Sequence, residues 1–248
     1  MDLMRHGLAL GIAAPLRQER PQGKGRRRRV PGRALIEKRP WLVASLIAGT
    51  SYWLAAKGQV PGLWLILWKG AGVALLAAYA WAHHPSRSAH LLALVMALGA
   101  IGDMVLEVDF TGGAAAFFAG HIAAIALYLR HPRASLSGLD KAVAVVSVIG
   151  VPALSWALSG RMDVAGYALL LGGMATAAFA SDFPRSRVAL GAAMFVVSDL
   201  LIFARMVPLA RSAVPGLLIW PLYYFGQFMI CTGVIATLRT RGEFRPVR

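Results

Sequence analysis

Long apolar runs follow one another along most of the chain, and short stretches rich in proline, glycine and charge separate them. Each run approaches the roughly 20 apolar residues that a helix needs to cross the hydrocarbon core of a bilayer. The stretches between runs are short enough to act as loops within a single polytopic domain. The pattern predicts eight transmembrane helices, at residues 41–56, 63–82, 88–108, 113–131, 140–159, 163–180, 186–207 and 215–238.

Composition agrees with this pattern. The chain has 248 residues, of which 58% are hydrophobic and 15% charged, and its mean hydropathy is +0.61. Such a chain has more apolar surface than one soluble core can bury. We therefore expect an all-α, polytopic transmembrane helix bundle over residues 41–238, with the lipid bilayer as its surroundings. Cys231 is the only cysteine, which excludes an intramolecular disulfide and a CxxC metal or redox site.

The formal net charge of +15 is concentrated before the first predicted span. A block of this kind is typical of a solvated, disordered tail that touches anionic lipid headgroups, and we expect no nucleic-acid partner. Residues 1–40 are accordingly predicted to form a basic cytoplasmic tail, and residues 239–248 a second, shorter one. Richness in alanine and arginine is typical of a bacterial protein from a GC-rich genome, so the predicted location is the bacterial plasma membrane.

The basic residues between the spans predict the orientation. With the N-terminus inside, the inner side holds the basic tail and most of the arginines in the loops, and the outer side holds only Lys57, Arg161, Arg205 and Arg211. This asymmetry follows the positive-inside rule for an even number of spans. Both termini are therefore predicted to be cytoplasmic.

Two predicted spans carry an acid well inside the apolar run, Asp103 in ALGAIGDMVLEV and Asp199 in AMFVVSDLLIF. A carboxylate at membrane depth costs about 3 kcal/mol on insertion scales, so it usually faces a polar interior and has a function. In the predicted topology both acids lie past the midplane, at similar depth toward the outer side. They are the candidate catalytic residues, although structural pairing with Lys69 or an arginine is an alternative.

Other polar residues fall in the same outer layer. They are candidates for contact with a substrate: Lys69, Glu107, His121, Tyr223, Tyr224 and Gln227. Each also has a structural interpretation. Glu107, like Asp109, could simply mark the end of the third span, and Lys69 could reach the headgroups from near its helix end. The histidine, the glutamine and the tyrosines could form hydrogen bonds between helices or an aromatic belt.

A short pattern recurs four spans apart. A small residue, an aspartate and then apolar residues occur in GDMVLEV and again in SDLLIFA. Two segments that are four spans apart cross the membrane in the same direction. A parallel internal repeat would therefore bring equivalent positions of the two segments together across a central cavity. The similarity is slight, and chance is the alternative.

Five short motifs follow one another along the chain: WLILWKGAG with Lys69, ALGAIGDMVLE with Asp103, FFAGHIAAIALY with His121, GAAMFVVSDLLIF with Asp199, and WPLYYFGQFMICTG with Tyr223, Tyr224 and Gln227. Taken in order, they resemble the YhhN-like lysoplasmalogenase family of eight-span membrane proteins. The resemblance covers roughly residues 41–238. Gly70 departs from it, because the family often has proline after the lysine of the second span.

The resemblance implies hydrolysis of the vinyl ether bond of a lysoplasmalogen, which releases a fatty aldehyde and a glycerophospho-alcohol, with Asp103 and Asp199 as the catalytic pair. An enol ether is cleaved by protonation of its β-carbon and capture of the resulting cation by water. Two aspartates in a low-dielectric cavity can divide these roles, one protonated and one ionised. His121, Tyr224 and Gln227 would orient water or the lysophospholipid, and Lys69 would attract its phosphate.

Two other classes of function stay open on the sequence alone. A proton-coupled small transporter uses intramembrane acids as a relay, and a non-catalytic lipid-binding protein would pair them with bases. We expect no cofactor, and no metal, because the chain has no HExxH or multi-histidine motif. The natural headgroup and the oligomeric state are not predicted.

Overall fold

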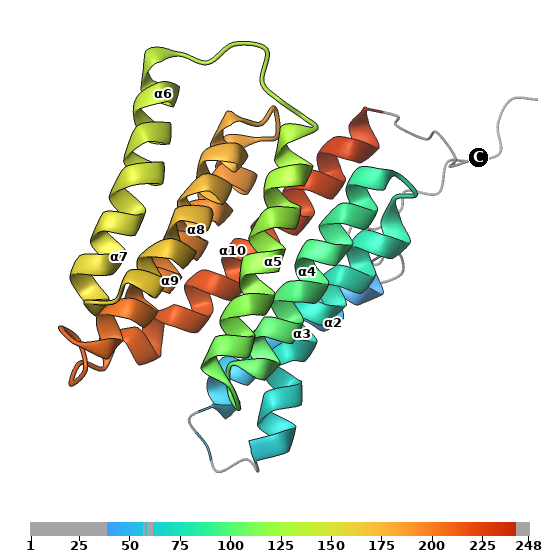
Figure 1. Cartoon of the computed structure of the whole chain (residues 1–248). Coiled ribbons are helices and arrows are strands. Elements are labelled where there is room, and N and C mark those ends of the chain that lie inside the picture. The colour runs from blue at the N-terminus through green and yellow to red at the C-terminus, as the bar shows by residue number, and fades with distance from the viewer. Residues whose placement is uncertain (1–38, 57, 59–61, 242–248) are drawn as a thin grey trace, which may run out of the picture.

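The computed structural model describes residues 39–56, 58 and 62–241. Residues 1–38 of the predicted N-terminal tail and residues 242–248 of the predicted C-terminal tail lie outside the described residues. The described part folds into helices without a strand, which confirms the predicted all-α bundle (Figure 1). The helices are α2 (Pro40–Ala55), α3 (Gly62–His83), α4 (Arg87–Val105), α5 (Phe110–Leu129), α6 (Gly138–Val145), α7 (Val151–Ser159), α8 (Met162–Ala180), α9 (Leu190–Met206) and α10 (Val214–Thr240).

Two short π-helical segments extend neighbouring helices. The segment η1 (Val146–Gly150) joins α6 to α7, and η2 (Arg185–Ala189) leads directly into α9. Within the described residues, seven continuous helices are then long and apolar enough to cross a membrane. The first helix, α2, has 16 described residues, fewer than the roughly 20 that a perpendicular crossing needs. The chain is thus an integral membrane protein whose first predicted span is shorter than the others.

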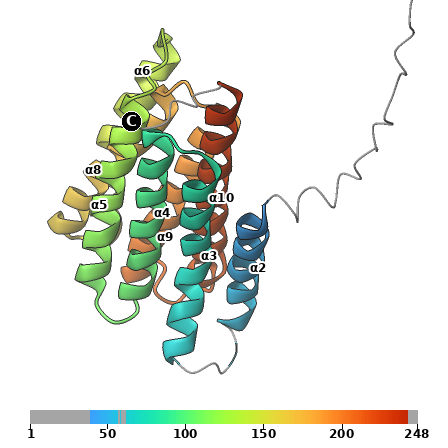
Figure 2. The ribbon, with the colours of Figure 1, turned by 90° about the vertical axis from the view of Figure 1, so that its right-hand side faces the viewer.

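The helices form two groups that α10 ties together. One group contains α2, α3, α4 and α5, in which each helix packs on the next, and the other contains α6 to α9. Helices α5 and α8 meet where the two groups touch. Helix α10 runs diagonally behind the other helices in Figure 1, and Figure 2 shows it beside α3. It packs on α9 as well as on α2, α3 and α4. A polar layer contributed by several helices can therefore meet in the middle.

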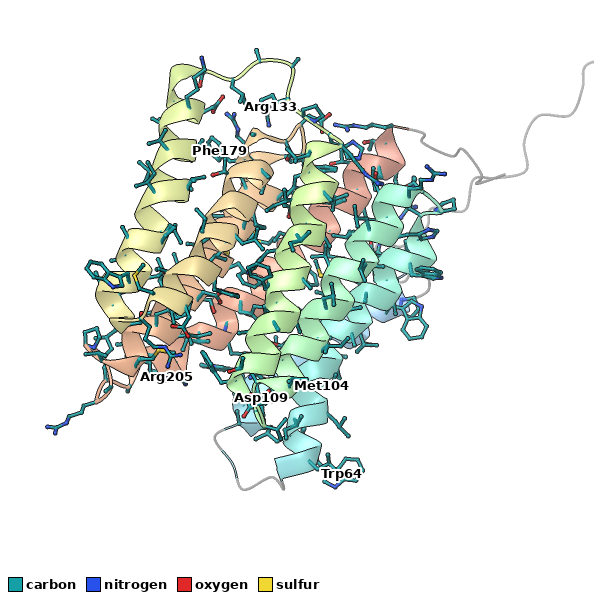
Figure 3. All side chains as sticks on the ribbon, in the orientation of Figure 1. Trp64, Met104, Asp109, Arg133, Phe179 and Arg205 are labelled. Atoms are coloured by element: carbon teal, nitrogen blue, oxygen red, sulfur yellow. The ribbon has the colours of Figure 1, made fainter. Side chains whose placement is uncertain are left out.

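The two ends of the bundle differ in charge. The end with the α4–α5, α7–α8 and α9–α10 connections, called the cavity end below, includes Asp109 and Arg205, whereas Arg133 lies at the opposite end (Figure 3). The opposite end carries most of the basic residues of the described chain: Arg87, Arg130, Arg133, Lys141, Arg185, Arg187, Arg239 and Arg241. By the positive-inside rule this arrangement favours the opposite end as the cytoplasmic one.

Asp109 has a local structural role. Its carboxylate accepts hydrogen bonds from the backbone N–H groups of Thr111 and Gly112, both at 3.0 Å, and so caps the start of α5. The cap satisfies donors that an N-terminal helix turn leaves without partners. It fixes the tight connection between α4, which carries Asp103, and α5, which carries His121.

A proline inside α10 leaves one backbone carbonyl without its helical donor where α10 packs on α2. Pro221 has no N–H to donate to the carbonyl of Leu217, four residues earlier. The indole N–H of Trp53 on α2 donates to this carbonyl at 3.2 Å instead. One turn further along, α10 crosses α9 closely, since a Cβ on Gly191 would lie 2.6 Å from the carbonyl oxygen of Gly226. These contacts fix the part of α10 that carries Trp220 and Tyr223.

Candidate functional site

A cavity of about 630 Å³ lies among α3, α4, α5, α8, α9 and α10 at the cavity end, and we call it the main cavity. Its volume lies within the roughly 300–1,000 Å³ range of small-molecule sites. Most of the wall is apolar or aromatic, with Phe117, Phe118, Ile202 and Trp220 among its members. The polar and charged lining residues are Lys69, Asp103, Thr111, Arg161, Asp163, Tyr167, Ser198, Asp199 and Tyr223.

Asp103 reaches the main cavity from α4. It is 2% exposed, and its Oδ2 accepts a hydrogen bond of 2.8 Å from the Tyr223 hydroxyl on α10. The rings of Phe117 and Phe195 lie edge-on to the Tyr223 ring, with centroids 5.7 and 5.2 Å away. This aromatic packing holds the tyrosine in place and keeps the surroundings of the carboxyl group apolar.

Asp199 reaches the same cavity from α9. It is 6% exposed, and its Oδ2 accepts a hydrogen bond of 2.8 Å from the Tyr167 hydroxyl on α8. The Tyr167 oxygen lies 3.0 Å from Nε2 of His121 on α5. Because Tyr167 gives its single hydroxyl proton to Asp199, the His121 Nε2–H must donate to it. A chain of hydrogen bonds therefore runs from α5 through α8 to α9.

The two acids have matching surroundings. Each is buried at the wall of the main cavity, and each accepts a hydrogen bond from a tyrosine of another helix, half-buried Tyr167 or buried Tyr223. A carboxyl group in this setting can give up or take a proton toward a molecule in the cavity, because its second oxygen is not used by the tyrosine. This arrangement is suited to acid and base chemistry on an uncharged or weakly polar group.

Lys69 lines the main cavity and is paired. Its Nζ lies 2.5 Å from Oε1 of Glu107, and the two side chains are 15% and 43% exposed. Glu107 does not line the main cavity, so it meets a cavity ligand only through Lys69. The pair fixes the ammonium group at the wall, where it adds positive charge on the side of Asp103.

A second ion pair lies at the mouth of the main cavity. Arg161, just before α8, binds the carboxylate of Asp163 through two guanidinium nitrogens. Both side chains are more than half exposed, so the pair is worth little in stability. It places both signs of charge where the cavity meets the surface.

His121 and Gln227 face a separate small cavity of about 20 Å³, deeper in the bundle. That volume is enough for roughly one water molecule. Gly99 lies next to both Tyr223 and Gln227, since a Cβ there would be 3.1 Å from the Tyr223 hydroxyl and 3.3 Å from Nε2 of Gln227. His121 and Gln227, which were predicted to contact substrate, thus lie behind the tyrosines that hold the acids.

Tyr224 points in another direction from its neighbour Tyr223. Its hydroxyl lies 3.0 Å from Ser45 Oγ on α2, and that serine donates to the carbonyl of Gly72 at 2.6 Å. The ring fills the space next to Gly49. Tyr224 is therefore part of the α2–α3–α10 packing and does not line the main cavity.

Several lining residues were not predicted. Tyr167, Trp220, Arg161 and Asp163 all face the main cavity. Tyr167 is a polar aromatic residue inside a predicted span, which is the same signal that selected Tyr223. Arg161 and Asp163 border a short loop and give no such signal, because charged residues are ordinary at the ends of spans.

No obvious metal centre accompanies the acids. Across residues 39–56, 58 and 62–241, no three His, Cys, Asp or Glu side chains are close enough together to hold a metal ion. The absence of a cofactor remains an expectation from the sequence.

Comparison with known proteins identifies one family. The family model described as the YhhN family matches residues 64–234, which is more than half of the chain. The matched range includes Lys69, both acids, both of their tyrosines and His121. Searches of curated proteins and of solved structures gave no match.

Proposed function

The chain belongs to the YhhN family, and on that premise we propose that it is an intramembrane hydrolase of the vinyl ether bond of lysoplasmalogens or of a related lysolipid. The single observation that supports this most is that Asp103 and Asp199 lie in one cavity, each held by a tyrosine. The cavity has a mainly apolar wall for a hydrocarbon chain and charged residues toward its mouth for a headgroup.

The reaction needs a proton donor, a water molecule and a proton acceptor. One acid transfers its proton to the β-carbon of the enol ether, and the electron pair of the double bond forms the new C–H bond. The adjacent oxygen then stabilises the positive charge, and the ionised carboxylate of the other aspartate stabilises it further. Cleavage therefore begins without a covalent bond between protein and substrate.

Water completes the hydrolysis. It attacks the α-carbon of the cation, and a carboxylate takes up the proton that the water releases, which gives a neutral hemiacetal. The hemiacetal collapses by breaking its bond to the glycerol oxygen, and that oxygen receives the hydroxyl proton. One water is consumed, a fatty aldehyde and a glycerophospho-alcohol leave, and the pair of acids again holds one proton.

Neighbouring side chains would support this chemistry. Tyr167 and Tyr223 fix the orientation of the acids, and His121 fixes Tyr167. Lys69, with Glu107 behind it, would attract the phosphate. Gln227 and the small cavity would hold a water molecule near the tyrosines. The positive-inside rule would place the cavity on the outer side of what we propose to be a bacterial plasma membrane.

The test is incubation of purified protein with a panel of lysolipids in D₂O, followed by mass spectrometry of the products. Protonation of the β-carbon predicts an aldehyde with one deuterium on the carbon next to the carbonyl. An ester-linked lysolipid should be left intact. Release of no aldehyde from any enol ether would contradict the proposal. Solute uptake into proteoliposomes in that case would favour a carrier. The absence of both aldehyde release and solute uptake would favour a lipid-binding protein.

A further inference from the structure

The lining of the main cavity is exposed on only one side of the bundle. The lining residues that are exposed on the molecular surface all belong to α5 or to the beginning of α8: Phe110, Thr111, Ala115, Phe118, Arg161, Asp163 and Gly166. The lining residues of α3, α4, α9 and α10 are buried or half-buried. The main cavity therefore opens between α5 and α8.

The opening is a slot that runs along the helices. On α5 the exposed lining extends from Phe110 to Phe118, which is about 12 Å along the helix axis. The slot ends where the His121 side chain meets Tyr167 and joins the two helices. Its bottom is thus formed by the tyrosine that holds Asp199.

The chemistry of the slot changes along its length. Thr111 and the Arg161–Asp163 pair lie at the cavity end, where the bundle meets water or headgroups. Further into the span the edges are small or apolar, with Ala115 and Phe118 on one side and Gly166 on the other. A Cβ on Gly166 would have no atom within 4 Å. This change from charged to apolar edges matches an amphiphile with a polar headgroup and one hydrocarbon chain.

We propose that the slot between α5 and α8 is a lateral entrance, through which the hydrocarbon chain of a single-chain lysolipid passes from the bilayer into the main cavity. This rests on the proposed function. The headgroup stays at the Arg161–Asp163 end while the chain slides sideways past Gly166. The enol ether, which lies between headgroup and chain, then comes to the level of the two acids.

Gly166 makes the entrance testable without disturbing the fold. Gly166→Cys places a thiol at the edge of the slot with no neighbour to displace. The native Cys231 is fully buried, so the new thiol is the accessible one. Gly216→Cys on α10 is the matched control, because that glycine is also exposed, has open space around its Cβ and lies outside the lining.

The experiment uses full-length protein in lipid vesicles and alkyl methanethiosulfonates of increasing length. Two readouts are taken: photolabelling of the main cavity by a lysophospholipid with a diazirine in its chain, and aldehyde release from a lysoplasmalogen. A long alkyl adduct at residue 166 should lower both by about tenfold or more, because it overfills the slot. A methyl adduct should lower them little, a reductant should restore them, and the same adducts at residue 216 should change neither.

The outcomes separate this inference from the proposed function. Blocked photolabelling without aldehyde release from any protein supports the entrance and contradicts the hydrolysis. Aldehyde release that persists with the long adduct at residue 166 overturns the entrance and leaves the hydrolysis intact. Failure of the unmodified protein to be photolabelled in the main cavity also overturns the entrance.

Discussion

The Tyr167 hydroxyl donates to the Asp199 carboxylate at 2.8 Å and thereby joins α8 to α9 at the wall of the main cavity. His121 on α5 donates to the same hydroxyl oxygen at 3.0 Å. Three helices thus fix the orientation of one carboxyl group. The orientation of Asp199 depends on Tyr167 more directly than on any other described side chain.

Tyr167→Phe should lower turnover by about ten- to hundredfold, because a hydrogen bond to a carboxylate is worth about 1.5–3 kcal/mol. The ring contacts with His121 and Phe203 remain. Steady-state kinetics of aldehyde release measures the effect. Tyr79→Phe, which removes a hydroxyl from a buried tyrosine outside both cavities, is the control and should keep full turnover. Equal losses in the two variants would contradict a specific role for Tyr167.

The two acid–tyrosine pairs should behave as separate units. Tyr167→Phe should affect activity strongly in the wild type and little in an Asp199→Glu background, where the hydrogen-bond geometry is already lost. Tyr223→Phe should show the same dependence on Asp103. Double-mutant cycles on kcat check this, with coupling of about 1 kcal/mol or more within a pair. Additive effects within both pairs would argue against the arrangement.

Lys69→Met should raise KM for a phosphate-bearing lysolipid by about tenfold and change kcat less, since it removes an attraction that is present before the chemistry. An enol ether of glycerol without phosphate should show no such change in KM. Glu107→Gln leaves the ammonium group in place and should weaken binding little or strengthen it, because the partner carboxylate no longer competes. A similar rise in KM for both substrates would mean that Lys69 is structural.

The Leu217 carbonyl, which Pro221 leaves without a backbone donor, should depend on Trp53. Trp53→Phe leaves the Leu217 carbonyl without the indole donor and should lower the free energy of unfolding by about 1 kcal/mol. In a Pro221→Ala background the new backbone N–H can serve this carbonyl, so the effect of Trp53→Phe should shrink. Reversible unfolding in mixed micelles measures both. Equal effects in the two backgrounds would contradict this role of Trp53.

The crossing of α9 and α10 should not accept a side chain. Gly191→Ala places a Cβ 2.6 Å from the Gly226 carbonyl oxygen and should cost about 1–3 kcal/mol of stability. Gly216→Ala, where a Cβ meets nothing within 4 Å, is the control and should be neutral or slightly stabilising. Thermal unfolding in detergent decides this. A neutral Gly191→Ala would show that the helices can separate at low cost.

The length and spacing of the apolar runs were enough to predict the bundle, because each span must satisfy its backbone hydrogen bonds as a helix in lipid. The first helix was predicted to within one residue at each end, at 41–56 for the observed Pro40–Ala55. The sequence also selected Asp103, Asp199, Lys69 and Tyr223, and all four line the main cavity. Their roles in catalysis and binding remain predictions.

The direction of a polar side chain was harder to predict than its depth. Tyr223 and Tyr224 are neighbours on α10 and equally polar, yet one faces Asp103 and the other Ser45. Which face of a helix meets the cavity depends on how all the helices pack. Tyr167 was missed for the same reason. The α5–α8 slot leaves no pattern in the sequence, because the residue types along its edges also occur elsewhere in the spans and at their ends.

The measurement that tests the central claim most directly is aldehyde release from lysoplasmalogen by purified Asp103→Asn and Asp199→Asn proteins, compared with the wild type and with a Tyr79→Phe control. Asparagine keeps the size of each side chain but can neither donate nor take up the carboxyl proton. The account predicts that each asparagine variant folds, as judged by monodisperse elution and thermal unfolding, and has lost at least about 99% of turnover. Folded variants that both retain substantial turnover would contradict it.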